Sequence, residues 1–204
     1  MAGQLCGLPM SAAAGAQTQT QPRLPGDLFI WYIVLLEGAT FSVLFATFAF
    51  VRLWHLDLFR QSQQQLDVSM GAINTALLLT GSWCVARAVL AVRASRRGAA
   101  FGWLGAGMLG GFGFVALKIT EYSDKVAHGI ELSTNLFFDF YYLLTGFHLF
   151  HVLAGLMGLG MAAIGLARQR GAALNAHALE TAATFWHLVD LLWLVLFPLV
   201  YVLR

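Results

Sequence analysis

Charged residues are scarce in this chain. They make up 11% of its 204 residues, against about a quarter in a typical soluble domain. Hydrophobic residues make up 59%, and the mean hydropathy is +0.72. This balance excludes a large soluble domain and indicates an integral membrane protein. The net charge of +2 is too small to indicate nucleic-acid binding, and the basic residues are scattered at helix ends instead of forming a patch.

Cysteine and proline are also rare. The two cysteines, Cys6 and Cys84, form no CxxC or Cys/His spacing, so the sequence predicts neither a disulfide framework nor a cysteine metal site. Only Pro198 interrupts a long apolar run, because the other three prolines fall within residues 1–26. This N-terminal stretch lacks the positive start and the apolar segment of a secretory signal. We expect residues 1–26 to form a mobile tail.

Long apolar runs are what the chain has in abundance. About 20 helical residues cross a bilayer core of about 30 Å, and five stretches are long enough, at residues 27–53, 70–93, 100–122, 136–167 and 178–203. We therefore expect an all-α fold in which residues 27–204 form a single membrane domain of five transmembrane helices.

The basic residues are distributed unevenly between the two ends of this expected bundle. The short connection after the second span carries Arg93, Arg96 and Arg97, whereas acidic residues such as Asp57 and Asp67 dilute the basic ones at the opposite end. Cytoplasmic loops carry an excess of Lys and Arg. The sequence thus predicts a cytoplasmic N-terminus and a C-terminus on the outer side.

Several polar residues lie inside the apolar spans, where lipid makes them costly. At 1.5 Å per residue, Glu37, His187 and Asp190 lie about 14 to 18 Å from the cytoplasmic face, and His151 lies about one turn away. The pair His148 and His151 shares one helix face, as does the pair His187 and Asp190. We expect these histidines and Asp190 to form a hydrogen-bonded network between the last two spans.

Other interpretations of the histidines remain open. A proton relay is one, and bis-imidazole haem ligation, pairing His148 or His151 with His187, is another. Two histidines three residues apart on one helix do not suit the wide axial separation that a haem requires. Copper or zinc would need third and fourth ligands that converge on the same point, and we expect no metal site.

Glu37 is an isolated carboxyl in its span. Since burial of a charge without a partner is costly, we expect Glu37 to be neutral and hydrogen-bonded unless water reaches it. It is then either a buried structural acid, which we favour, or a site that modulates proton entry in a neighbouring subunit.

Further polar residues fall near the ends of the spans. Arg87, Arg168 and Glu180 are placed near the cytoplasmic interface, where long basic side chains extend to the headgroups. They provide either generic anchoring or a site for an anionic phospholipid. Lys118 and Glu121, three residues apart near the outer interface, are expected to pair.

Two motifs in the last two spans are specific when they occur together. They are His-x-x-His-Val, which ends at Val152, and Trp-His-x-Val-Asp-x-x-Trp, which begins at Trp186. With them the chain resembles subunit III of the haem–copper oxidase superfamily from residue 27 to the end. The matching stretches are Trp31–Arg52 with Glu37, Asn74–Leu79, Lys118–Tyr122, Thr145–Val152 with Gly155, Glu180, Phe185–Trp193 and Tyr201.

The resemblance implies a helical membrane subunit without haem or copper, which binds phospholipid in a cleft and packs on the catalytic subunit I. It implies support of turnover stability and proton uptake there. Glu37 corresponds to the family's intramembrane glutamate, and Arg168 and Glu180 fall in a stretch that helps to hold lipid. His148, His151, His187 and Asp190 match motif positions of the family.

Many members of that family have seven helices, and this chain has five spans. The two helices that usually open the lipid cleft are absent. The short form resembles the five-helix bacterial subunit III and also the NorE-like protein associated with nitric oxide reductase. The stretch Phe138–Tyr142 before Thr145 favours the NorE-like group.

We therefore expect a non-catalytic accessory subunit of a respiratory haem–copper complex, either a cytochrome c oxidase or a nitric oxide reductase, in the bacterial cytoplasmic membrane. Its expected partners are the haem-bearing catalytic subunit and membrane phospholipids, and we expect no redox cofactor of its own. The alternative is a standalone membrane haem protein that carries electrons. A small transporter would show an inverted repeat, and none is visible in the sequence.

Overall fold

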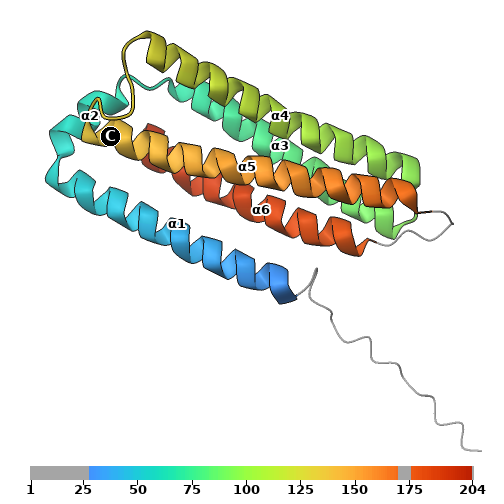
Figure 1. Cartoon of the computed structure of the whole chain (residues 1–204). Coiled ribbons are helices and arrows are strands. Elements are labelled where there is room, and N and C mark those ends of the chain that lie inside the picture. The colour runs from blue at the N-terminus through green and yellow to red at the C-terminus, as the bar shows by residue number, and fades with distance from the viewer. Residues whose placement is uncertain (1–27, 170–175, 204) are drawn as a thin grey trace, which may run out of the picture.

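The computed structural model describes residues 28–169 and 176–203, and within them the regular structure is entirely helical. The predicted N-terminal tail, residues 1–26, lies outside the described residues. Figure 1 shows the long helices lying side by side along one axis. In chain order the elements are α1 (Leu28–Trp54), α2 (Leu56–Gln63), α3 (Val68–Arg93), α4 (Arg97–Ala127), α5 (Leu136–Arg168), α6 (His177–Phe197) and the π-helix η1 (Pro198–Val202).

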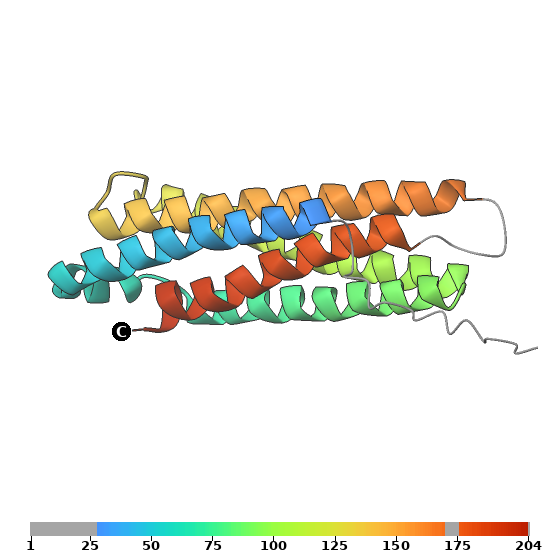
Figure 2. The same cartoon turned by 90° about the horizontal axis from the view of Figure 1, so that it is seen from below.

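The five predicted spans are confirmed as helices. Among the described residues, α1, α3, α4, α5 and the continuous pair α6–η1 are long and apolar enough to cross a membrane. The chain alternates direction through them, so that α1 and α6 begin at the end of the bundle where α3 passes into α4 (Figures 1 and 2). Helix α4, with 31 residues, is longer than the predicted 100–122, whereas α5 matches its predicted bounds to within one residue. Which end faces the cytoplasm stays a prediction.

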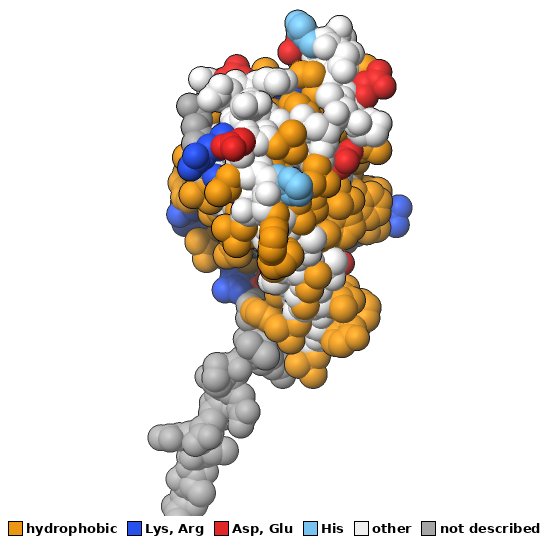
Figure 3. Space-filling model, turned by 90° about the vertical axis from the view of Figure 1, so that its left-hand side faces the viewer, with side chains coloured by type: hydrophobic (Ala, Val, Ile, Leu, Met, Phe, Trp, Pro, Cys, Tyr) orange, Lys and Arg blue, Asp and Glu red, His pale blue; other side chains and the backbone are white. Residues whose placement is uncertain are grey.

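The segment between the first two spans differs from the loop that we expected, because it contains α2. One side of this short helix is buried through Phe59, Ser62 and Gln63. The Gln63 amide is tolerated in the interior because its Nε2 donates a hydrogen bond to the carbonyl of Val200 at 3.0 Å. Figure 3 views the bundle from the end at which α2 lies. It shows acidic, basic and histidine side chains on this end and hydrophobic side chains along the flanks.

Glycines bring α3 and α4 into close contact. A Cβ atom on Gly110 would lie 2.9 Å from the carbonyl oxygen of Leu77, and one on Gly107 would lie 3.0 Å from that of Gly81. Small residues at such positions allow two helix backbones to approach each other. Gly111 leaves room for α6 instead, because a Cβ atom placed on it would lie 2.6 Å from the ring of Trp186.

Helix α1 is the least embedded of the long helices. Only Ile30, Phe41 and Phe48 along it are buried. The Phe41 ring packs on Phe147 of α5 at a centroid distance of 5.1 Å, and the Phe48 ring packs on Phe59 of α2 at 5.3 Å. Much of the remaining apolar surface of α1 is exposed, as expected of a helix that contacts lipid or another subunit.

The last turn of the bundle is π-helical. Pro198 has no backbone N–H to continue the α-helical pattern, and from this residue to Val202 the chain widens into η1. The turn is held from both sides, because Leu203 N donates to the Pro198 carbonyl at 2.9 Å and Arg52 Nη2 donates to the Leu203 carbonyl at 2.6 Å. As a result, Val200 and Tyr201 lie in the core.

Candidate functional site

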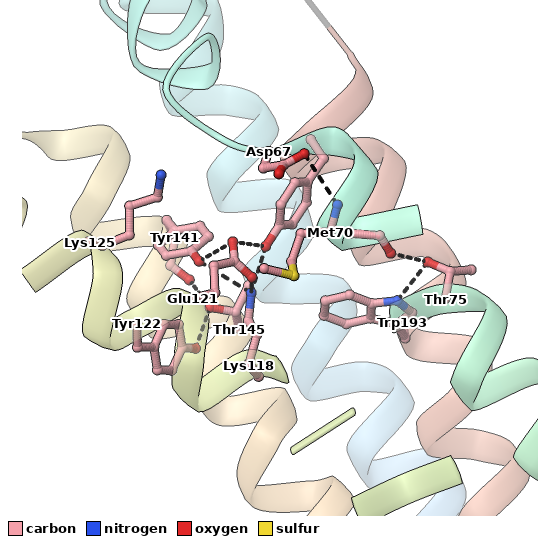
Figure 4. A network of polar contacts seen from close by, with 12 residues as sticks. Asp67, Met70, Thr75, Lys118, Glu121, Tyr122, Lys125, Tyr141, Thr145 and Trp193 are labelled. Carbon is pink, nitrogen blue, oxygen red and sulfur yellow. Dashed lines mark hydrogen bonds and ion pairs between the residues drawn. The ribbon is translucent and has the colours of Figure 1, made fainter. Parts of the chain in front are cut away.

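The most extensive polar cluster surrounds Lys118 on α4 (Figure 4). Its Nζ donates to Glu121 Oε2 at 3.0 Å, to the Tyr141 hydroxyl at 3.2 Å and to the Tyr201 hydroxyl at 2.6 Å. Both tyrosine hydroxyls donate in turn to Glu121 Oε1 at 2.7 Å. The cluster thereby joins α4, α5 and η1 through one buried ion pair.

The predicted pairing of Lys118 with Glu121 is confirmed, and the pair is buried inside the bundle. Its place near the outer membrane interface stays a prediction. The Lys118 side chain is 0% exposed and that of Glu121 is 5% exposed. Burial of such a pair is tolerated only when further hydrogen bonds satisfy the remaining polar atoms, and the two tyrosines provide these bonds. The Lys118 Nζ also lies between 4.9 and 5.6 Å from the ring centroids of Tyr122, Tyr141, Trp193 and Tyr201, which adds cation–π attraction.

Sequence reasoning missed Tyr141 as a partner of Glu121, although a tyrosine hydroxyl inside an apolar span is itself a signal that a polar partner lies nearby. The same holds for two hydrogen bonds beside the cluster, between Tyr122 and Thr145 at 2.6 Å and from Trp193 Nε1 to Thr75 at 2.9 Å.

Glu37 is not isolated. Its Oε2 lies 3.1 Å from Nε2 of His151 on α5, and Nδ1 of the same imidazole lies 2.8 Å from the Phe147 carbonyl. The Glu37 side chain is 23% exposed and the His151 side chain 7%. The contact therefore lies at the edge of the α1–α5 interface, where Glu37 is partly exposed and His151 is buried.

The predicted network between the last two spans does not form with the expected partners. His151 bonds to α1, as described, and His187 Nδ1 lies 2.7 Å from the Ser82 hydroxyl of α3. The interface of α5 with α6 is occupied instead by Trp186, whose ring lies 3.0 Å from the position of a Cβ on Gly155. Close packing there turns the histidines toward the neighbouring helices.

His148 and Asp190 complete the motif residues. His148 is fully buried between the rings of Phe114 and Trp193, at centroid distances of 5.7 and 5.1 Å, and neither of its ring nitrogens has a hydrogen-bond partner among the described residues. Asp190 is 7% exposed, and its Oδ1 likewise has no partner there. Asn74 of α3 is a third buried side chain of this kind.

This geometry bears on haem ligation. Both nitrogens of His151 are engaged, and aromatic rings flank His148, so neither imidazole presents an open side for a porphyrin. In the part of the chain that the structure describes, no three residues among His, Cys, Asp and Glu are grouped so that they could hold a metal ion. The arrangement favours helix–helix bonding by the intramembrane polar residues.

The three candidate headgroup residues do not form one site. Glu180 accepts an ion-paired hydrogen bond from Arg93 at 2.8 Å. Arg87 lies over the Trp103 ring at 5.7 Å, and Arg168 ends α5. A separate apolar groove of about 560 Å³ runs between α1, α5 and α6, with Ile33 and Phe185 among its walls.

Comparison with known proteins identifies the family. The family model of cytochrome c oxidase subunit III matches residues 32–204. The chain is 27% identical over 173 residues to cytochrome bo(3) ubiquinol oxidase subunit 3 of Pseudomonas aeruginosa, covering 85% of this chain and 82% of the relative. It is 31% identical over 182 residues to cytochrome c oxidase subunit 3 of Synechocystis, covering 87% and 76%. It is also 30% identical to cytochrome c oxidase subunit 3 of Bacillus subtilis, over 86% of each chain. The chain belongs to the cytochrome c oxidase subunit III family.

Proposed function

We propose that this chain is the non-catalytic accessory subunit of a haem–copper oxidase and acts by packing against the haem-bearing catalytic subunit. The observation that carries the proposal is the family match over residues 32–204. Its two motifs lie in the packed interiors of α5 and α6, where their polar atoms either bond to neighbouring helices or are enclosed by aromatic rings. The oxidoreductase activity then resides in the complex and not in this subunit.

The Glu37–His151 contact is the feature through which we propose that the subunit supports proton uptake by its partner. The pair combines a carboxyl and an imidazole at 3.1 Å, and Glu37 is the more exposed of the two groups. A partner helix or water at the face of α1 has direct access to it. The burial of His151 holds the imidazole in one orientation.

A phospholipid acyl chain is our proposed occupant of the groove between α1, α5 and α6. The groove is lined mainly by apolar side chains and is open at the surface of the bundle.

We propose that the complex reduces oxygen in the bacterial cytoplasmic membrane, with the arginine-rich α3–α4 connection facing the cytoplasm. The relatives named above are subunits of a ubiquinol oxidase and of cytochrome c oxidases, so the electron donor depends on the partner. A nitric oxide reductase, favoured by the stretch Phe138–Tyr142, is the competing partner.

Affinity purification from native membranes tests the proposal. The tagged chain is extracted in mild detergent, and the co-purifying proteins are identified by mass spectrometry together with haem and copper analysis. We expect a catalytic subunit that carries both haem and copper. Recovery of a nitric oxide reductase would change the partner. A chain that purifies alone with about one haem, seen as a Soret band, would overturn the proposal in favour of an electron carrier.

A further inference from the structure

The hairpin formed by α3 and α4 carries four arginines, Arg87, Arg93, Arg96 and Arg97, and two of them are already engaged. Arg93 pairs with Glu180, and Arg97 donates to the carbonyls of Ala167 and Gln169 at 2.6 Å each. The side chains of Arg87 and Arg96, by contrast, have neither a hydrogen bond nor an ion pair with any residue that the structure describes. Two guanidinium groups are thus left available on one short hairpin.

Both of these arginines line the same small cavity, of about 130 Å³. Leu90 and Ala94 of the α3 side and Ala99 of α4 form its apolar wall, and Trp103 closes it. The Arg87 guanidinium lies 5.7 Å from the centre of the Trp103 ring. Stacking on an indole holds a guanidinium in place while its N–H groups remain free for an acceptor.

The cavity lies close to the end of the bundle where α3 passes into α4. Arg87 precedes the end of α3 by six residues, which is about 9 Å along the helix. Trp103 lies six residues after the start of α4, also about 9 Å along its helix, and its ring packs on that of Trp83 at a centroid distance of 5.1 Å. Tryptophans near the ends of spans are typical of the membrane–water interface, where arginines meet phosphate groups.

We infer that Arg87 and Arg96 bind the phosphate group of an anionic phospholipid, whose glycerol backbone rests against Trp103. Arginine suits this task because its planar fork donates two parallel hydrogen bonds to phosphate oxygens. The apolar wall and the paired tryptophans favour a lipid over a soluble anion. This site is separate from the groove beside α1 and from Glu37, so it does not depend on the identity of the catalytic partner.

The purified chain in detergent can be titrated with dioleoyl phosphatidylglycerol or dioleoyl phosphatidylcholine, and the bound lipid counted by native mass spectrometry. We expect preferential retention of phosphatidylglycerol. Arg87→Gln and Arg96→Gln should each weaken this retention about tenfold, since each removes a charged hydrogen bond. Arg87→Lys, which keeps the charge without the fork, should restore only part of it.

Arg60→Gln is the matched control, because Arg60 is an exposed arginine at the opposite end of the bundle. It removes the same charge and should leave retention unchanged, while thermal unfolding verifies that all variants fold. Equal retention of both lipids, or an equal effect of Arg60→Gln and Arg87→Gln, would overturn the inference. Displacement of phosphatidylglycerol by millimolar inorganic phosphate would show that a soluble anion is the ligand, and would overturn the assignment to lipid.

Discussion

His151 Nε2 lies 3.1 Å from Glu37 Oε2, so one hydrogen bond joins a helix that is mostly exposed to a helix in the centre of the bundle. The imidazole is fixed at its other nitrogen by the Phe147 carbonyl. The carboxyl is therefore positioned by α5 although it belongs to α1.

Glu37→Gln should leave the fold and the haem content of the purified complex unchanged, because the glutamine side-chain amide can still form a hydrogen bond with His151 Nε2 and Glu37 is not expected to be a metal ligand. We expect fewer turnovers before inactivation, since an amide cannot exchange a proton with the partner subunit. Haem spectra and the time course of oxygen consumption measure the two effects. Loss of the haem spectrum in this variant would contradict the prediction.

Lys118→Met should destabilise the subunit by about 3–5 kcal/mol, because it leaves Glu121 buried without its cation. The double variant Lys118→Met/Glu121→Gln should recover a large part of that loss, since no unpaired charge remains. Reversible unfolding in mixed micelles measures both values. If the single and double variants prove equally unstable, the ion pair is not the source of the cost.

Gly110→Ala should loosen the contact of α3 with α4, because the new Cβ would lie 2.9 Å from the Leu77 carbonyl oxygen and 3.2 Å from the Gly81 Cα. Backbone atoms cannot move aside as a side chain can, so we expect a loss of about 1–3 kcal/mol. Gly105→Ala on the same helix is the control. Nothing lies within 4 Å of its Cβ position, and the change should add about 0.5–1 kcal/mol of helix stability. If the two variants respond similarly in thermal unfolding, the close contact of Gly110 with the α3 backbone is not what limits stability, and the prediction is refuted.

Asn74→Leu should be neutral or stabilising. Both amide atoms of Asn74 are buried without a partner among the described residues, and an apolar side chain of similar size removes the cost of burying them. Ser82→Ala, about two turns further along the same helix, should have the opposite effect. We expect it to lower the free energy of unfolding by about 1 kcal/mol, because it removes the hydrogen-bond partner of His187. Unfolding midpoints of the two variants give the comparison; a destabilised Asn74→Leu would show that the amide is satisfied.

The spans were predictable because a long apolar run is fixed by composition and length alone. Their partners were not. The helices are apolar on most sides, so the sequence contains little information on which face meets which neighbour. Glu37 and His151 lie far apart in the chain, and only the packing of α1 on α5 brings them together. His187 likewise turns to Ser82 on α3, which no spacing within its own helix could reveal.

The Lys118–Glu121 pairing followed from the spacing of three residues along one helix, whereas its burial did not. Burial depends on Tyr141 and Tyr201, which arrive from α5 and from the π-helical turn after Pro198. The short helix α2 escaped prediction for a similar reason. Its polar sequence reads as a loop, and its Gln63 becomes an interior residue only through the carbonyl of Val200.

The hydrogen bonds that residues 200–203 accept from distant side chains imply an order of events during biosynthesis. Lys118, Gln63 and Arg52 each find a partner in residues 200–203, which the ribosome adds after all five spans have begun to emerge. Until then Gln63 and Arg52 lack these partners, whereas Lys118 can already bond to Glu121 and Tyr141. The nascent bundle can therefore complete these contacts only after residues 200–203 have been added.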